Sequence, residues 1–141
     1  MPTINLERVS GDFGFLTTDE LGHELKQDSS PEFGGNNFGI RPMQLLLAGL
    51  AGCSAIDVIS ILKKQRQEIK GFKMTVEGEK EKVKGKDFSL WKNIHIHLML
   101  TGEIELDKAT RAFELAINKY CSVAETLRLA GAIIEIKVSV N

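Results

Sequence analysis

The sequence predicts an α+β protein built around one long core helix. Two observations lead to this prediction: an uninterrupted helical pattern follows Pro42, and strand-like alternation of apolar and polar residues comes in separate blocks on both sides of it. Strands and helices that are segregated along a chain are typical of an α+β fold. A chain of 141 residues can bury such a core, so we expect a single domain spanning residues 1–141.

The first 27 residues alternate short apolar stretches with turn residues, in the order TINLERV, SGDFG, FGFLTT and ELGHELKQ. This pattern predicts a meander of antiparallel strands. Residues 28–42 hold Gly-Gly, Asn-Asn and two prolines, which is typical of a loop. Pro42 suits the first turn of a helix, because the backbone N–H that it lacks has no partner there in any case.

From Met43 to about Lys70 the helical pattern is interrupted only by two tolerable glycines. The stretch LLLAGLAGCSAIDVISIL, residues 45–62, is apolar on nearly every face, whereas the following KKQRQEIK is polar and cationic. We expect a buried core helix whose cationic end lies in solvent, as the helix dipole favours. The apolar stretch reaches the lower length limit for a membrane span. Ser54, Asp57 and Ser60 argue against that location, because a carboxylate inside a bilayer is costly.

After Gly71, the segments FKMTVEGEKEKV and SLWKNIHIHLMLTGEIEL alternate as strands, and KGKDF between them predicts the turn of a long hairpin. Asp107 is expected to cap a helix over residues 108–120, where apolar residues recur at helical spacing. A shorter helix should run from Cys121 to Gly131, and IIEIKVSV is expected to close the fold as a strand.

Composition narrows the function classes. Hydrophobic residues make up 43% of the chain, charged residues 26%, and the net charge is -1, as in ordinary globular proteins. There is no basic stripe, so we expect no nucleic-acid partner. The first twenty residues lack the basic start, apolar run and cleavage site of a secretory signal, which favours a cytoplasmic location.

The chain has two cysteines, Cys53 and Cys121. They are too few for a secreted disulfide framework and too far apart for a zinc-type motif. Two interpretations stay open: both thiols are buried and inert, or the fold brings them together as a reactive pair. Ser122 and Glu125 have the spacing of a capping box, which puts Cys121 at a helix N-terminus or just before it. We expect the helix dipole to lower its thiol pKa there.

Cys53 lies mid-helix, where apolar surroundings would raise its pKa. Asp57 is one turn further on the same face and, as a carboxylate in a core helix, predicts a local polar network. A cation between the two would favour the thiolate, and the sequence leaves five arginines open for this role: Arg8, Arg41, Arg66, Arg111 and Arg128. Gly49 and Gly52 leave the helix surface bare beside Cys53, either for close packing of another backbone or for a small substrate.

His95 and His97 flank Ile96 on a predicted strand and therefore face the same side of the sheet. An H-x-H pair can bind a metal ion, but the sequence offers no third ligand for it. We therefore expect no metal site.

The segment RPMQLLLAGLAGCSAIDVISILKKQRQ, followed after a hairpin by KYCSVAETL, resembles the superfamily of osmotically inducible protein C and the organic hydroperoxide resistance proteins. The resemblance covers nearly the whole chain and includes two motifs in the right order and at the right separation. It implies an OsmC-like fold and an intertwined homodimer. In such a dimer antiparallel strands of both subunits wrap the long central helices, and two active sites lie at the interface.

The resemblance also implies thiol peroxidase chemistry. The Cys53 thiolate would attack the O–O bond of an organic hydroperoxide and become a sulfenic acid, with which Cys121 would condense to a disulfide. An external dithiol would then reduce the disulfide, and no metal, flavin or other cofactor is needed. Such a nucleophile requires a dry, apolar pocket, and we expect its lining to include Met43, Gly49, Leu50 and Asp57.

The sequence departs from the peroxidases of this superfamily at two places. They carry a glutamate directly after the proline that opens the central helix, where this chain has Met43 followed by Gln44. They also carry an arginine in the N-terminal strand region, and SGDFGFLTTDELG contains none. Our hypothesis is that Arg41 supplies the cation and Gln44 orients it. The alternative is an OsmC-like dimer that binds a small hydrophobic molecule or senses redox state without peroxidase turnover.

Overall fold

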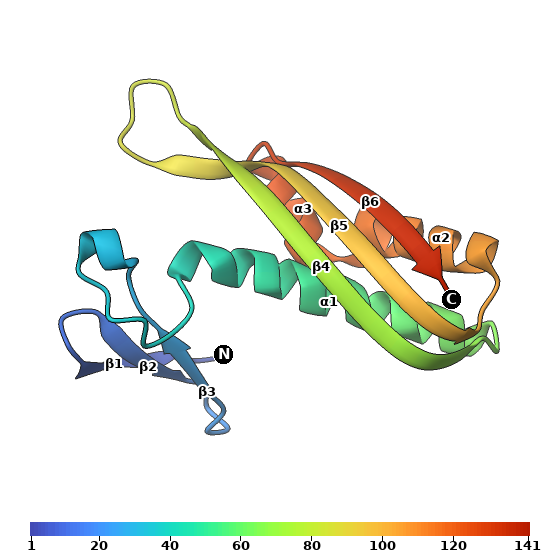
Figure 1. The fold of residues 1–141 in the computed structure, drawn as a ribbon, viewed down its shortest axis with the longest axis horizontal. Coiled ribbons are helices and arrows are strands. Elements are labelled where there is room, and N and C mark those ends of the chain that lie inside the picture. The colour runs from blue at the N-terminus through green and yellow to red at the C-terminus, as the bar shows by residue number, and fades with distance from the viewer. The chain divides into compact units, whose positions relative to one another are not determined.

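The computed structural model describes residues 1–141, which divide into two compact units, Met1–Leu46 and Leu47–Asn141 (Figure 1). Each unit contains a three-stranded sheet, and a long helix begins at the end of the first unit. The predicted α+β class is therefore confirmed. The two units are described separately below.

The first unit is the predicted antiparallel meander. It consists of β1 (Asn5–Ser10), β2 (Gly14–Thr18) and β3 (Glu24–Gln27), in the order β1-β2-β3. Its buried residues are Gly14, Thr17 and Asp28, so it buries no large apolar side chain. Small sheets are stable in water only when they bury an apolar face. This sheet therefore has too little core within the chain to be stable by itself.

Asp28 organises the loop that precedes the long helix. Its carboxylate is 1% exposed and accepts backbone N–H groups from Ser29 at 2.7 Å, Asn36 at 2.9 Å and Phe38 at 3.1 Å. These bonds hold the pKa of Asp28 below its usual value, and the bond from Asn36 contributes most. The loop, which includes the 3-10 turn η1 (Pro31–Phe33), is thus fixed by one carboxylate.

The long helix α1 (Pro42–Lys64) starts where the sequence predicts but ends before the predicted Lys70. Arg66 adopts a left-handed backbone conformation with φ 58°. The N–H of Gln67 donates to the carbonyl of Leu62 at 2.9 Å, and that of Arg66 to the carbonyl of Lys63 at 3.0 Å. This pair of bonds is a Schellman motif, which usually has glycine at the left-handed position. The prediction that the helix continues over residues 65–70 is therefore wrong. The end of the helix was missed because an arginine, not the usual glycine, occupies the left-handed position.

Within one chain α1 buries a single stripe, formed by Leu50, Ser54, Val58 and Leu62. The expectation that this chain buries the helix on most faces is wrong, since its remaining faces are partly or fully open. By length and composition alone α1 could also cross a membrane. Its most apolar stretch of 18 residues has a mean hydropathy of 2.2, and 22% of that stretch is buried. This is weak evidence, because the core helix of a soluble protein meets the same criterion.

The second unit contains the predicted hairpin, β4 (Glu68–Lys82) and β5 (Ser89–Glu103), with β6 (Ile133–Val140) on the other side of β5. Because β6 runs parallel to β5, the chain must cross over between them, and the helical segment after β5 makes this crossover. The helices cover one face of this sheet (Figure 1). The β5 residues buried on that face are Trp91, Ile94, Ile96, Leu98 and Leu100.

The crossover holds α2 (Leu106–Leu115), the π-helical turn η2 (Ala116–Tyr120) and α3 (Ser122–Leu129). The prediction that Asp107 caps α2 is wrong. The N-cap is Glu105, whose side chain makes no capping hydrogen bond, and Asp107 lies in the first turn, where the helix dipole favours a carboxylate. The π turn was not predicted, and it leads directly to Cys121.

Candidate functional site

The second unit brings the two cysteines together. Cys53 lies in the middle of α1 and is half-buried, whereas Cys121 is 3% exposed. They are neighbours, because the Cys53 side chain is among the groups that raise the pKa of Cys121, and both are free thiols. Of the two interpretations left open by the sequence, the pairing in space is therefore the one that the fold supports.

Cys121 is itself the N-cap of α3. Its sulfur accepts the backbone N–H of Ala124 at 3.4 Å, the bond that a serine or aspartate oxygen usually makes at this position. The predicted location at a helix N-terminus is thus confirmed, with Ser122 as the first helical residue rather than the cap.

The expected direction of the Cys121 pKa is wrong. Burial, together with the neighbouring Cys53 thiol, raises the pKa of Cys121 from its ordinary 9.0 to about 11, and burial contributes most. The hydrogen bond from Ala124 acts in the opposite direction but is outweighed by burial. Cys121 is therefore protonated near neutral pH, which fits a thiol that reacts only after its neighbour has been oxidised.

A hollow of about 400 Å³ borders the two thiol-bearing segments. Asp57, one turn after Cys53, lines it, and so does Tyr120, which directly precedes Cys121. The other lining residues are Ser60, Ile61, Lys64, Gln65 and Leu115. Asp57 is only half-buried and makes no hydrogen bond or ion pair within the chain. The predicted polar network around Asp57 is therefore absent from a single chain.

Gly49 and Gly52 are exposed, and a Cβ atom added at either position would meet nothing within 4 Å. Within the second unit no other element packs closely against this surface of α1. Leu50, by contrast, is fully buried, and its carbonyl accepts the hydroxyl of Ser54 at 2.8 Å. Of the predicted pocket residues, Gly49 therefore lies on the open side of α1, whereas Leu50 lies in the core.

Arg41, Met43 and Gln44 lie in the first unit, at the start of α1. The backbone N–H of Gln44 donates to the carbonyl of Arg41 at 3.0 Å. The backbone N–H of Arg41 in turn donates to Oε1 of Gln44 at 3.4 Å. This is half of a capping box, with Gln44 at the third helical position. The side-chain oxygen of Gln44 thus contacts the backbone of Arg41 rather than its guanidinium.

Arg128 is a site residue that the sequence left undistinguished among five arginines. It lies on α3, is half-buried, and donates from Nη2 to the carbonyl of Ile117 at 2.5 Å and to Oδ1 of Asn118 at 3.0 Å. Both acceptors belong to the π turn next to Cys121. No sequence pattern reveals this contact, because an arginine in the last turn of a helix is ordinarily explained by the helix dipole.

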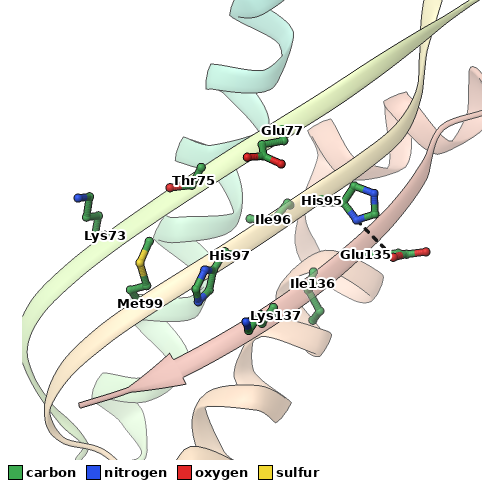
Figure 2. A pocket seen from close by; sticks show the side chains of 10 residues that line it. All are labelled: Lys73, Thr75, Glu77, His95, Ile96, His97, Met99, Glu135, Ile136 and Lys137. Carbon is green, nitrogen blue, oxygen red and sulfur yellow. Dashed lines mark ion pairs between the residues drawn. The ribbon is translucent and has the colours of Figure 1, made fainter.

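The histidine pair lies elsewhere, on the face of the β4-β5-β6 sheet that carries no buried core residues (Figure 2). There His95 forms an ion pair with Glu135 at 3.3 Å, and Nε2 of His97 is 2.8 Å from the hydroxyl of Ser139. The shallow hollow at this face measures about 500 Å³. The structure shows no group of three or more histidine, cysteine, aspartate or glutamate side chains that could hold a metal ion.

The fold and the site define a class of protein: an α+β protein in which a thiol on the long helix meets the thiol that caps a following helix. The family model described as OsmC-like protein matches residues 34–137. The chain therefore belongs to the OsmC-like family, as its motifs indicated, and family membership points to a redox or hydroperoxide-related function.

Three relatives show how far the similarity extends. Protein YhfA of Escherichia coli K12 is 34% identical over 117 residues, which are 82% of each chain. A hypothetical protein from Aquifex aeolicus VF5 has a solved structure with TM-score 0.82 and 29% identity, covering 100% of this chain and 96% of that one. A structure named organic hydroperoxide resistance protein OsmC, from Legionella pneumophila, has TM-score 0.72 and 20% identity, covering 100% and 96%. At that identity the last comparison concerns the fold alone.

Proposed function

We propose that this protein is a cysteine-based thiol peroxidase that reduces organic hydroperoxides in defence against oxidative stress, in the cytoplasm. The observation that carries the proposal is the closeness of the Cys53 and Cys121 side chains, because two neighbouring thiols can close to a disulfide. The proposed substrate class is the one in the name of the Legionella pneumophila structure, an organic hydroperoxide resistance protein that shares the fold of this chain.

The proposed reaction has two steps. The Cys53 thiolate attacks one oxygen of the hydroperoxide, the O–O bond breaks, the alcohol leaves with a proton, and the sulfur becomes a sulfenic acid. The Cys121 sulfur then attacks the Cys53 sulfur, the S–S bond forms, and water leaves with the thiol proton. Two thiols have been oxidised and one hydroperoxide has been reduced to an alcohol and water. An external dithiol returns the pair to the reduced form by exchange.

We assign the order of the two cysteines from their environments. Cys121 is nearly inaccessible, and burial keeps its thiol protonated near neutral pH. A substrate reaches Cys53 more easily, since that residue is half-buried and one turn from the open hollow at Asp57. In this proposal Arg41 supplies the cation that favours the Cys53 thiolate, and Gly49, which is open, and Asp57, which lines the hollow, form the pocket.

We further propose that the active form is a homodimer. The helix α1 leaves Gly52 and Ile56 open to solvent, and Ile56 is 67% exposed. The first unit exposes Ile4 and Leu6, at 66% and 55%, and buries no large apolar side chain. Apolar surface of this extent on a helix and a small sheet is stabilised when a second copy covers it.

A second candidate function is binding of a small hydrophobic molecule, or redox sensing without turnover. It is favoured by Met43, which stands where the peroxidases of the superfamily carry a glutamate. A redox sensor would form the disulfide once and would not cycle. A binding protein would bind its ligand equally well without Cys53.

The test mixes reduced protein with about one equivalent of an aryl alkyl hydroperoxide and follows thiol loss. We expect rapid loss of both thiols in the wild type, a trapped sulfenic acid in Cys121→Ser and no reaction in Cys53→Ser. Loss no faster than that of free cysteine in all three proteins would exclude peroxidase activity and favour the binding function.

A further inference from the structure

We infer that Arg128 is a positioning residue for Cys121: it locks the π turn Ala116–Tyr120 and thereby holds the Cys121 thiol against Cys53. The inference rests on the proposed Cys53–Cys121 disulfide, since it concerns the ease with which that bond closes. It assigns a role to a side chain whose hydrogen bonds go to neither sulfur.

The position of Cys121 depends on the hydrogen-bond register of the turn before it. Its backbone N–H donates to the carbonyl of Ala116 at 2.7 Å, five residues back. In a continued α-helix the same N–H would donate to the carbonyl of Ile117, four residues back. The extra residue in the turn therefore decides in which direction the chain leaves α2 and enters α3.

Arg128 donates to the carbonyl of Ile117, which would be the acceptor for the Cys121 N–H in the α-helical register. Its Nη2 donates to the carbonyl of Ile117 and, at 3.0 Å, to Oδ1 of Asn118. A charged donor on this carbonyl stabilises the π register, because a hydrogen bond from a guanidinium is stronger than one from a neutral amide. The α register would have to displace it. Shifting the register by one residue turns a helix by about 100°, which would carry the Cys121 side chain away from its present direction.

Arg128 also ties the two ends of the segment that contains the thiol. It lies near the end of α3, and its acceptors lie in the turn before α3 begins. Within this closed segment Cys121 is held at its backbone N–H by Ala116 and at its sulfur by the N–H of Ala124. The thiol therefore has little freedom to move relative to Cys53.

The effect of Arg128 is geometric. The groups that shift the pKa of Cys121 are its burial, the N–H groups of Ala124 and Val123, and Cys53, and Arg128 is not among them. Loss of Arg128 should therefore change how readily the disulfide closes while leaving the titration of Cys121 in place. A purely structural role would instead lower thermal stability without changing the thiol–disulfide equilibrium.

The experiment equilibrates the full-length protein with mixtures of reduced and oxidised glutathione and measures the equilibrium constant of the Cys53–Cys121 disulfide. The reaction converts one oxidised glutathione and the two thiols into the disulfide and two reduced glutathiones. Arg128→Met keeps most of the side-chain length and removes both donors. Arg128→Lys keeps the charge and one donor group. Arg111→Met is the matched control, since Arg111 is exposed and makes no hydrogen bond or ion pair in the structure.

We expect Arg128→Met to lower the equilibrium constant by at least about tenfold, because a charge-assisted pair of bonds is lost. The equilibrium constant of Arg128→Lys should lie between those of Arg128→Met and wild type, and that of Arg111→Met should equal the wild-type constant. The pH dependence of Cys121 alkylation should be the same in all four proteins. Should Arg128→Met fail to fold, Asn118→Ala, which removes one acceptor, serves in its place with an expected fall of about threefold.

Equal constants for wild type, Arg128→Met and Arg111→Met would overturn the inference, and so would an equal fall in both variants. Glutathione is the only oxidant in this assay. A protein that does not consume hydroperoxides can therefore still show the effect of Arg128, and failure of the peroxidase proposal would be seen separately in the hydroperoxide assay.

Discussion

The thiol of Cys53, in the middle of α1, lies next to the thiol of Cys121, which caps the N-terminus of α3. One sulfur is half-buried on a helix face beside an open hollow, and the other is almost fully enclosed. The two cysteines are thus neighbours with different environments. That difference gives each thiol a distinct expected reactivity, and the first predictions follow from it.

The rate of disulfide closure should increase with pH. Burial raises the pKa of Cys121 to about 11, so the fraction of attacking thiolate grows about tenfold for each pH unit below that value. We expect the closure rate, measured by rapid quenching after one turnover of hydroperoxide, to rise from pH 7 towards pH 10. A rate independent of pH in this range would show that Cys121 attacks from an environment other than the one described.

The stability of the reduced protein should decrease at high pH because of the same thiol. The pKa of Cys121 is higher in the folded state, about 11, than its ordinary 9.0, so the folded state binds the proton more tightly. The corresponding stability is fully present below pH 9.0 and is lost as the pH rises towards 11, by about 1.4 kcal/mol per pH unit.

Urea unfolding of wild type and Cys121→Ser under reducing conditions, at pH 8 and at pH 10, measures this loss. The difference in unfolding free energy between the two proteins should shrink by about 1 kcal/mol between these pH values. A constant difference would mean that Cys121 titrates alike in the folded and unfolded chains.

Arg41→Ala should slow the reaction of the Cys53 thiol. The physical reason is the loss of the cation that we propose favours the Cys53 thiolate, in a chain that lacks the usual glutamate at Met43. The rate of alkylation of Cys53 at neutral pH, in a Cys121→Ser background, measures this reactivity. If it is unchanged in Arg41→Ala, Arg41 is not the activating cation, and Arg41→Lys provides the control that preserves the charge.

Most elements of the fold could be predicted from residue patterns. The helix start at Pro42 and the β4–β5 hairpin follow from local signals that the structure retains. These signals are reliable because a proline at a helix start and alternating strands each depend on nearby residues only. The Ser122–Glu125 spacing placed Cys121 correctly at a helix N-terminus, although the cap is Cys121 itself.

The errors arose where distant contacts override local preference. Arg66 takes a left-handed conformation that sequence patterns assign to glycine, so the end of α1 was missed. The pKa of Cys121 is set mainly by burial, which only the packed fold supplies. The contact of Arg128 with the carbonyl of Ile117 requires the π turn Ala116–Tyr120, and no residue pattern in that segment predicts such a turn.

Asp28→Ala should destabilise the first unit and open the loop before α1. The Asp28 carboxylate accepts three backbone N–H groups, and these hydrogen bonds would be lost in the alanine variant. Because its pKa is lowered in the folded state, this contribution is present above about pH 4 and disappears as the pH falls further. Limited proteolysis near pH 7 should cut Asp28→Ala between residues 29 and 40 faster than Asp12→Ala, whose carboxylate is exposed.

Ile56→Glu should convert the proposed dimer into a monomer. Ile56 is 67% exposed in the single chain, so a glutamate there can be solvated and should leave the fold of one chain intact. In a dimer that covers α1 the same carboxylate would be buried without a partner, which costs several kcal/mol. Light scattering at micromolar concentration measures the result, with Leu129→Glu, at an 84% exposed position on α3, as the matched control. If the wild type is already a monomer of 15.6 kDa, or if Ile56→Glu remains a dimer, α1 is not the covered surface, and the exposed glycines beside Cys53 must then be explained by the substrate alone.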